Sequence, residues 1–258
     1  MPAPVVFIHG MFMNPLCWEK WAAHFEAAGR QVMAPAWPGH DGAPSDLRAK
    51  QPDPALGRVG LTDVVDSVSA VIAGLEEKPV LVGHSMGGLV AQLLLARSVA
   101  AAGVAIDSAP PAGVFTSQPS FLKANWPMIN PLHPVHEPHM ITFEEFAYAF
   151  ANTLTEAEQR AMYERYMVPE SRLIPRDSLG AAGHVDFSAP HVPLLLVSGG
   201  EDHIIPAALN RHNFTHYHDA DSVTVLEDFP GRDHLTILES GWGDVADFVL
   251  EWLGAQGL

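Results

Sequence analysis

Short, continuous apolar runs alternate with longer helical patterns along this chain, and that alternation restricts the possible folds more than any other feature. The expected strands are residues 5–8, 31–34, 80–82, 104–106, 194–198 and 223–226. The expected core helices are residues 18–28, 61–75, 86–101 and 244–253. The strands are apolar at consecutive positions, as in parallel sheets that helices cover on both faces. The sequence therefore predicts an α/β fold with a mostly parallel central sheet.

The alternation breaks off between residues 109 and 189. That stretch is rich in Pro, His and aromatic residues at first and shows no strand pattern. Its expected helices are residues 142–154, 155–167 and 170–179. Thr142 and Thr155 each have Glu three residues later, which is typical of a helix start. We predict a core of residues 1–108 and 190–258, with residues 109–189 inserted as a helical cap or lid.

Charge and composition exclude several classes of protein. The chain has 258 residues, of which 30 are acidic and 14 basic, giving a formal net charge of −16. That charge repels phosphate backbones and anionic lipids, so we expect neither a nucleic-acid nor a membrane partner. Cys17 is the one cysteine, so no internal disulfide can form. Neither a signal-peptide pattern nor a membrane-spanning apolar run is present, so we expect a cytoplasmic protein. Its oligomeric state is not indicated.

The segment Gly83-His84-Ser85-Met86-Gly87 matches the pattern G-x-S-x-G. It follows an expected strand and opens an expected helix, which is the context in which this pattern forms a nucleophile elbow. Glycine is needed two residues before and after Ser85 because side chains there would clash across the tight turn. The helix that follows directs its positive end toward any oxyanion that develops. Ser85 is therefore the candidate nucleophile.

A serine hydroxyl needs a base to remove its proton, and the base needs an acid to orient it. In this architecture the acid follows a late strand and the histidine follows the last one. Asp202 follows directly after the expected strand 194–198, and His234 lies in the loop after the expected strand 223–226. Glu201 and Asp107 remain weaker alternatives for the acid.

An oxyanion hole is expected from two backbone N–H groups, one after the nucleophile and one after the first core strand. Met86 supplies the first. Met11 is the candidate for the second, with Phe12 a weaker one, because Gly10 lets the backbone bend close. His9 is expected to support this loop through hydrogen bonds and not to take part in catalysis.

These motifs resemble those of the α/β-hydrolase fold superfamily, over essentially the whole chain. The stretches around residues 9–18, 77–88 and 231–235 are similar to the plant methylesterase and hydroxynitrile lyase branch. Lyases of that branch commonly carry threonine at the position of Gly10 and lysine after the catalytic histidine, where this chain has Leu235. The resemblance therefore favours the esterases. Epoxide hydrolases and haloalkane dehalogenases carry aspartate where Ser85 stands, which argues against both.

Two further groups of histidines could suggest a metal. His133, His136 and His139 recur at intervals of three, but two prolines among them argue against a helix that would align the rings. His212, His216 and His218 fall on and just after an expected helix that follows Pro206. No acidic ligand pattern accompanies them, so a polar helix face is the simpler interpretation. We expect no metal.

The sequence thus predicts a serine carboxylic-ester hydrolase that forms an acyl-enzyme, requires no cofactor and takes small to medium uncharged esters. The alternatives are another reaction of the same residues, such as lactone, amide or carbon–carbon bond hydrolysis, perhydrolysis or cyanohydrin cleavage, and a ligand receptor with slow turnover. Acyl-chain length, stereochemical preference and physiological substrate are not determined by the sequence.

Overall fold

A computed structural model describes residues 2–258, so Met1, the first residue of the expected core, lies outside the described residues. Six parallel strands form one sheet in the order β2-β1-β3-β4-β5-β6. Their bounds are β1 Val5–Ile8, β2 Val32–Met33, β3 Val80–His84, β4 Ala102–Ile106, β5 Leu194–Gly199 and β6 Thr224–Phe229. Every residue of β1, β3, β4 and β5 is buried. The predicted α/β fold with a parallel sheet is confirmed.

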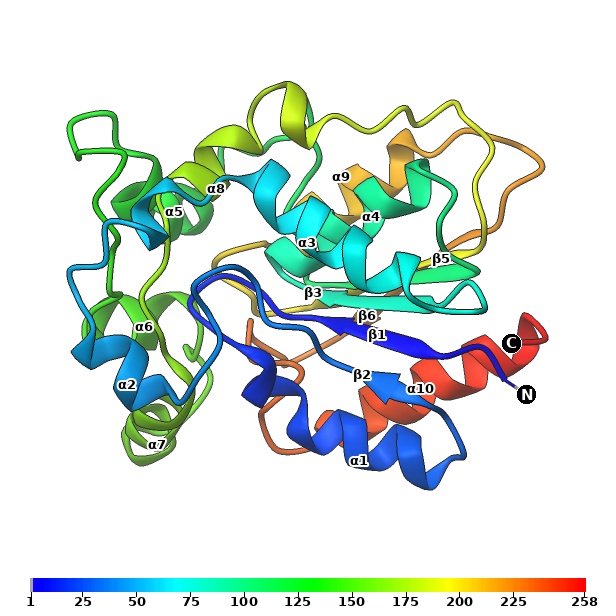
Figure 1. The fold of residues 1–258 in the computed structure, drawn as a ribbon, viewed down its shortest axis with the longest axis horizontal. Coiled ribbons are helices and arrows are strands. Elements are labelled where there is room, and N and C mark those ends of the chain that lie inside the picture. Colours follow the sequence, from blue (N-terminus) through cyan, green and yellow to red (C-terminus); the bar gives the residue numbers. More distant parts are fainter. Residues whose placement is uncertain (1) are drawn as a thin grey trace.

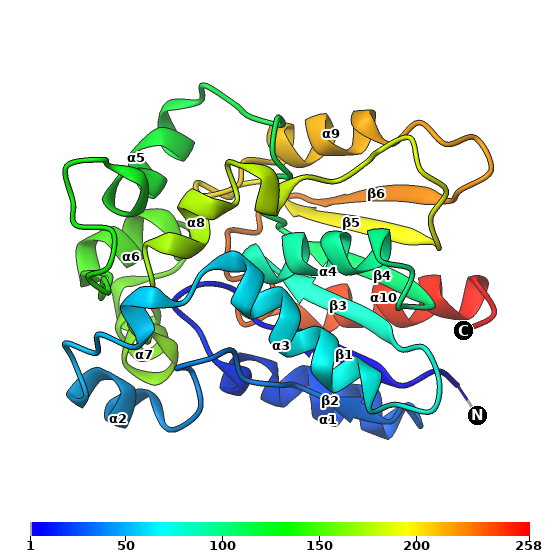
Figure 2. The ribbon, with the colours of Figure 1, turned by 45° about the horizontal axis from the view of Figure 1, so that its top comes forward.

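Helices cover both faces of the sheet (Figures 1 and 2). One face carries α1 (Glu19–Ala27) and α10 (Trp242–Ala255), and the other carries α3 (Leu61–Ala73), α4 (Met86–Ala96) and α9 (Ala207–His216). The buried residues of α3 recur at helical spacing: Leu61, Val64, Val65, Val68 and Ile72. Apolar cover on both faces explains why the inner strands need no alternation of polar and apolar residues. None of the helices within residues 2–258 is both long and apolar enough to cross a membrane.

The direction of chain progression reverses at β1, because β2 lies on one side of it and β3 on the other. Ile8, at the end of β1, pairs with Gly83, near the end of β3. In open parallel sheets, ligands bind in the crevice outside the carboxyl ends of the strands at such a reversal. This point of the fold therefore brings the loop after β1 next to Ser85.

The chain between β4 and β5 contributes α5 (Pro119–Ile129), α6 (Phe143–Ala149), α7 (Glu156–Tyr166) and α8 (Leu173–Asp177). They gather with α2 (Pro44–Ala49) at the end of the sheet where the strands finish, on the left of Figure 1. Thr142 accepts a hydrogen bond from the Glu145 N–H, and Thr155 accepts one from the Glu158 N–H. Both predicted helix starts are confirmed.

Several local expectations were wrong, among them the helix expected at residues 170–179, which spans only Leu173–Asp177. The helix expected at residues 86–101 ends at Ala96, because Ser98 adopts a left-handed turn with φ 57° and β4 already begins at Ala102. The helix α5 was not expected, since its sequence contains Pro127. That proline lies in the last turn of α5, where it removes one backbone N–H donor, and the helix ends two residues later at Ile129.

Candidate active site

Ser85 occupies the sharp turn between β3 and α4, with φ 56° and ψ −122°. A positive φ is strained for a residue with a side chain. The backbone can close this turn only around glycines: a Cβ on Gly83 would lie 2.0 Å from the Gly87 carbonyl oxygen, and one on Gly87 would lie 2.2 Å from that of Ile8. Ser85 is 8% exposed and lines a pocket beside the turn. The strained turn thus presents Ser85 to the pocket at the N-terminus of α4.

The loop after β1 passes directly against Ser85. A Cβ on Gly10 would lie 2.7 Å from the Cβ of Ser85, so a larger residue at this position would push the loop away. Met11 and Phe12 line the same pocket as Ser85. The Phe12 N–H donates to a Glu170 carboxylate oxygen at 3.3 Å, so it is engaged elsewhere. Because the Phe12 N–H is already bonded, the Met11 N–H remains the candidate oxyanion donor of this loop.

Met86 is the first residue of α4, where a backbone N–H has no partner within the helix. Met86 also lines the pocket. The Met86 amide therefore lies beside Ser85 and is not used by the regular structure of α4.

His9 uses both of its ring nitrogens within the fold. Its Nδ1–H donates to the Gly10 carbonyl at 2.9 Å, and its Nε2 accepts the Trp37 N–H at 3.2 Å. Burial lowers the pKa of His9 well below its usual value, and nearby His40 lowers it further. The ring is therefore neutral and holds two loops together.

Asp202 and His234 meet at the same edge of the sheet. His234 Nδ1 lies 2.6 Å from Asp202 Oδ2. The other carboxylate oxygen of Asp202 accepts the backbone N–H groups of Ile204 at 2.7 Å and Ile205 at 2.9 Å. Burial raises the pKa of Asp202, and these two donors oppose that rise. Because both of its oxygens are hydrogen-bonded, the Asp202 carboxylate fixes the orientation of the His234 imidazole.

The Nε2 atom of His234 is buried and makes no hydrogen bond within residues 2–258. Phe150, which lines the same pocket as Ser85, packs edge-on against the His234 ring with centroids 5.1 Å apart. Burial lowers the pKa of His234 to about 3, so Nε2 carries a lone pair at neutral pH. Hydrogen bonds between a nucleophile and its base commonly shorten only when substrate binds. His234 can therefore serve as a base.

The two alternative acids lie in different surroundings. Glu201 is exposed. Asp107 is fully buried at the end of β4, where its Oδ1 accepts the Gly199 N–H at 2.6 Å and its Oδ2 has no partner among the described residues. Burial raises the pKa of Asp107 well above its usual range, and Asp202 raises it further. Asp107 is therefore a second buried carboxyl group near the Asp202–His234 pair.

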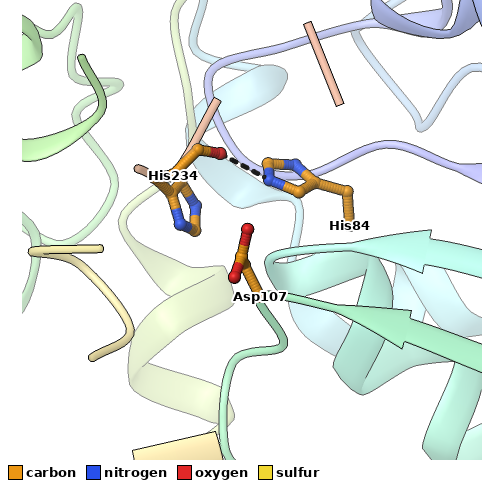
Figure 3. A group of neighbouring side chains, drawn as sticks. All are labelled: His84, Asp107 and His234. Atoms are coloured by element: carbon orange, nitrogen blue, oxygen red, sulfur yellow. Dashed lines mark hydrogen bonds between the residues drawn. The ribbon is translucent and has the colours of Figure 1, made fainter. Parts of the chain in front are cut away.

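Figure 3 shows Asp107 with His84 and His234, a buried group whose ligand-type atoms lie within 4.8 Å of one another. The His84 Nε2–H donates to the His234 carbonyl at 2.8 Å, which joins the two residues. Burial lowers the pKa of His84 well below its usual value. The side chains of His84 and Asp107 thus pack close to His234 in the interior of the protein.

The three histidines at 133, 136 and 139 do not converge. His139 Nε2 lies 3.2 Å from a Glu145 carboxylate oxygen, whereas His136 Nδ1 lies 3.3 Å from the Gly57 carbonyl. His133 is exposed. Of these rings only His139 reaches the pocket.

Comparison with known proteins identifies the family of this chain. Residues 5–248 match the model of the alpha/beta hydrolase family. The chain belongs to the alpha/beta hydrolase family. No curated protein matches this hydrolase in sequence.

Solved structures share the fold at low sequence identity. Polyneuridine aldehyde esterase is 18% identical over 97% of this chain and 99% of its own, with a TM-score of 0.70. A monoacylglycerol lipase from Paleococcus ferrophilus is 22% identical over 98% of this chain and 96% of its own, with a TM-score of 0.69. A pyrethroid hydrolase from Sphingobium faniae JZ-2 is 17% identical over 99% and 98%, with a TM-score of 0.70. At such identities the likeness concerns the fold alone.

The pocket of this hydrolase is mainly apolar. Its apolar lining from the chain between β4 and β5 comprises Ala109, Ala124, Pro127, Met128, Ile141, Phe150 and Pro175. The polar residues that line it besides Ser85 are Asn125, His139 and Glu145, and no Lys or Arg lines it.

Sequence reasoning missed Glu170, which joins the chain between β4 and β5 to the loop after β1. The Glu170 carboxylate accepts the Phe12 N–H, and two residues earlier the Val168 N–H donates to the Phe12 carbonyl at 2.9 Å. Both backbone groups of Phe12 are therefore held, although its φ is 61°. No periodicity or motif marks Glu170, because its partner lies 158 residues away.

His40 also contacts the Glu170 carboxylate. Its Nε2 lies 3.1 Å from the Glu170 carboxylate, and both side chains are fully buried. Burial by itself would lower the pKa of His40, but the Glu170 carboxylate outweighs burial and raises the pKa. Glu170 and His40 thus form a buried ion pair behind the loop that carries Met11 and Phe12.

Replacing Glu170 with alanine is expected to lower the free energy of unfolding by about 3–5 kcal/mol, because it leaves a buried His40 and the Phe12 N–H without a partner. Glu170→Gln should cost less, since one oxygen remains to accept. Urea denaturation measures both, with the exposed Glu144→Ala as the control that should change little. Equal, small effects of the two Glu170 variants would contradict the interpretation.

Proposed function

We propose that this hydrolase is a serine carboxylic-ester hydrolase whose nucleophile is Ser85, whose base is His234 and whose acid is Asp202. The observation that carries the proposal is the Asp202–His234 contact of 2.6 Å at the same sheet edge as the strained Ser85 turn. Neighbours named as an esterase and a lipase support an ester as the bond that is cleaved.

In the first half of the proposed reaction, Ser85 Oγ attacks the ester carbonyl carbon while His234 Nε2 takes the hydroxyl proton. Asp202 stabilises the imidazolium that forms. The carbonyl oxygen gains the negative charge and receives hydrogen bonds from the Met11 and Met86 N–H groups. The intermediate then breaks its bond to the alcohol, which leaves with the proton from His234. An acyl group remains on Ser85.

In the second half, a water molecule gives a proton to His234 Nε2 and attacks the acyl carbonyl. The same two N–H groups stabilise the second oxyanion. When that intermediate collapses, Ser85 Oγ recovers the proton and the carboxylic acid is released. The sequence of steps needs only the residues of this chain, water and the ester.

We also propose that residues 109–189 act as a cap that selects the substrate. Seven apolar residues of this segment line the pocket, and the one acid that lines it, Glu145, would repel a carboxylate. Small to medium uncharged esters are the class that fits this lining.

The proposal is tested by hydrolysis of p-nitrophenyl esters from acetate to laurate, together with a fluorophosphonate probe that labels activated serines. We expect turnover of the shorter esters and probe attachment at Ser85, located by peptide mass spectrometry. Turnover without labelling of Ser85 would contradict the assigned nucleophile. Labelling without ester turnover would contradict the ester as substrate and direct the search to lactones, amides and diketones.

The pH profile should reflect the burial of His234. Only its neutral form accepts the Ser85 proton, so activity falls as the pH drops through the pKa of His234. Because burial lowers that pKa to about 3, we expect the acid limb of kcat/KM to lie below the ordinary imidazole value of about 6.5. An acid limb at or above that value would show that the charge of Asp202 outweighs burial.

This measurement needs a check on folding. Buried neutral histidines titrate at lower pH in the folded than in the unfolded chain, so stability decreases as the pH falls below about 6.5. Circular dichroism at each pH separates loss of the fold from protonation of His234.

A further inference from the structure

The proposed reaction makes no use of the histidines of α9. His212 and His216 are one helical turn apart on this helix, and His218 follows just beyond its end. The Nε2 atoms of His212 and His216 face each other at 3.3 Å. Helix α9 lies at the surface, beyond the β5 and β6 side of the sheet (Figure 2). Two imidazoles are thus brought together outside the candidate active site.

This spacing matches that of two ligands on one metal ion. Zinc binds imidazole nitrogen at roughly 2.0–2.1 Å, so two nitrogens of a tetrahedral site lie about 3.3 Å apart. Histidines four residues apart on one helix face form the zinc-binding half of a recurrent motif. We propose that His212 and His216 form a surface site for a divalent transition-metal ion that prefers imidazole, such as Zn²⁺, Ni²⁺ or Cu²⁺.

The surroundings of His212 orient its Nε2 lone pair. Its Nδ1 lies 3.3 Å from the Phe115 carbonyl, which can only accept, so the ring proton is on Nδ1. A metal-binding histidine almost always donates its other N–H to such a group. The Nε2 atom that faces His216 is therefore free to bind a metal.

His216 is held by packing. Its ring lies against that of Phe187, with centroids 5.1 Å apart. Without a metal, His216 Nε2–H donates to His212 Nε2 across the 3.3 Å contact. When a metal binds, that proton moves to Nδ1 of His216, so both Nε2 atoms become ligands and no net charge has to be removed.

A third histidine lies close to the pair. The His218 ring lies 6.5 Å from that of His216, close enough for His218 to approach as a third ligand. Water would occupy the remaining positions.

Isothermal titration of the full chain with Ni²⁺ and with Zn²⁺ tests the site. We expect one ion per chain and at least tenfold weaker binding in His212→Asn and in His216→Asn. His184→Asn, which removes an isolated exposed histidine, is the matched control and should leave binding unchanged. With Cu²⁺, electron paramagnetic resonance should show two nitrogen ligands in the unaltered chain and at most one in each variant.

Two results would overturn the proposal. One is the absence of binding in the unaltered chain. The other is binding that survives both His212→Asn and His216→Asn, which would place the metal elsewhere, for instance at His84, Asp107 and His234. Because none of these readouts uses ester turnover, the metal site and the proposed esterase activity can fail independently.

Discussion

Ser85→Ala is expected to reduce ester turnover by about 10⁴-fold or more, because no other group at the turn can form the acyl-enzyme. The variant should keep its fold: Ser85 is already strained, and alanine adds no atom to the turn. Initial rates with the best p-nitrophenyl ester measure the loss, and Tm verifies folding.

A neighbouring serine provides the control. Ser108 is also buried at the start of the chain between β4 and β5, but it does not line the pocket, and its hydroxyl accepts from Gln92 and donates to the Ala109 carbonyl. Ser108→Ala should therefore keep turnover within about tenfold of the unaltered rate. A loss of less than tenfold in Ser85→Ala would exclude Ser85 as the nucleophile.

Asp202→Asn is expected to lower kcat by about 10³- to 10⁴-fold while the fold persists. An amide N–H₂ facing His234 Nδ1 favours the tautomer with the proton on Nε2, which cannot accept the Ser85 proton. Steady-state kinetics with the same ester measure this loss. KM should change little, since Asp202 does not line the pocket that holds the ester.

Asp107→Asn tests whether Asp202 or Asp107 is the acid that orients His234. Asp107 accepts the Gly199 N–H and makes no hydrogen bond to His234, so its amide should retain most of the activity. If Asp107→Asn costs more turnover than Asp202→Asn, the assignment of the acid must be exchanged.

Local sequence patterns were enough to predict the sheet and its covering helices. Continuous apolar runs predicted all six strands, because strands covered on both faces place every side chain in apolar surroundings. The sequence did not predict the end of every helix. The end of α4 depends on a left-handed turn at Ser98, and nothing in that residue type requires such a turn.

The candidate site could be found from the sequence where its chemistry is local. Gly83, Ser85 and Gly87 lie within one turn, so the spacing of the glycines alone identifies the turn. Asp202 and His234 could be proposed because each follows a strand, and the carboxyl ends of parallel strands share one edge.

Other features depend on contacts between distant segments. Glu170 meets His40 and Phe12 only because the chain between β4 and β5 folds back over the loop after β1. That contact engages the Phe12 N–H and so favours Met11 as the oxyanion donor. Likewise, the facing of His212 and His216 follows from helical spacing, but the ring orientations come from Phe115 and Phe187, which lie far away in sequence.

The sequence by itself therefore determined the α/β fold and the position of Ser85, because apolar periodicity and tight turns are properties of neighbouring residues. Only the tertiary structure decided which buried groups are paired and which are free, since pairing depends on distances between segments that no local pattern encodes. The same packing sets the pKa shifts of His234 and Asp107, because burial is a property of the whole fold.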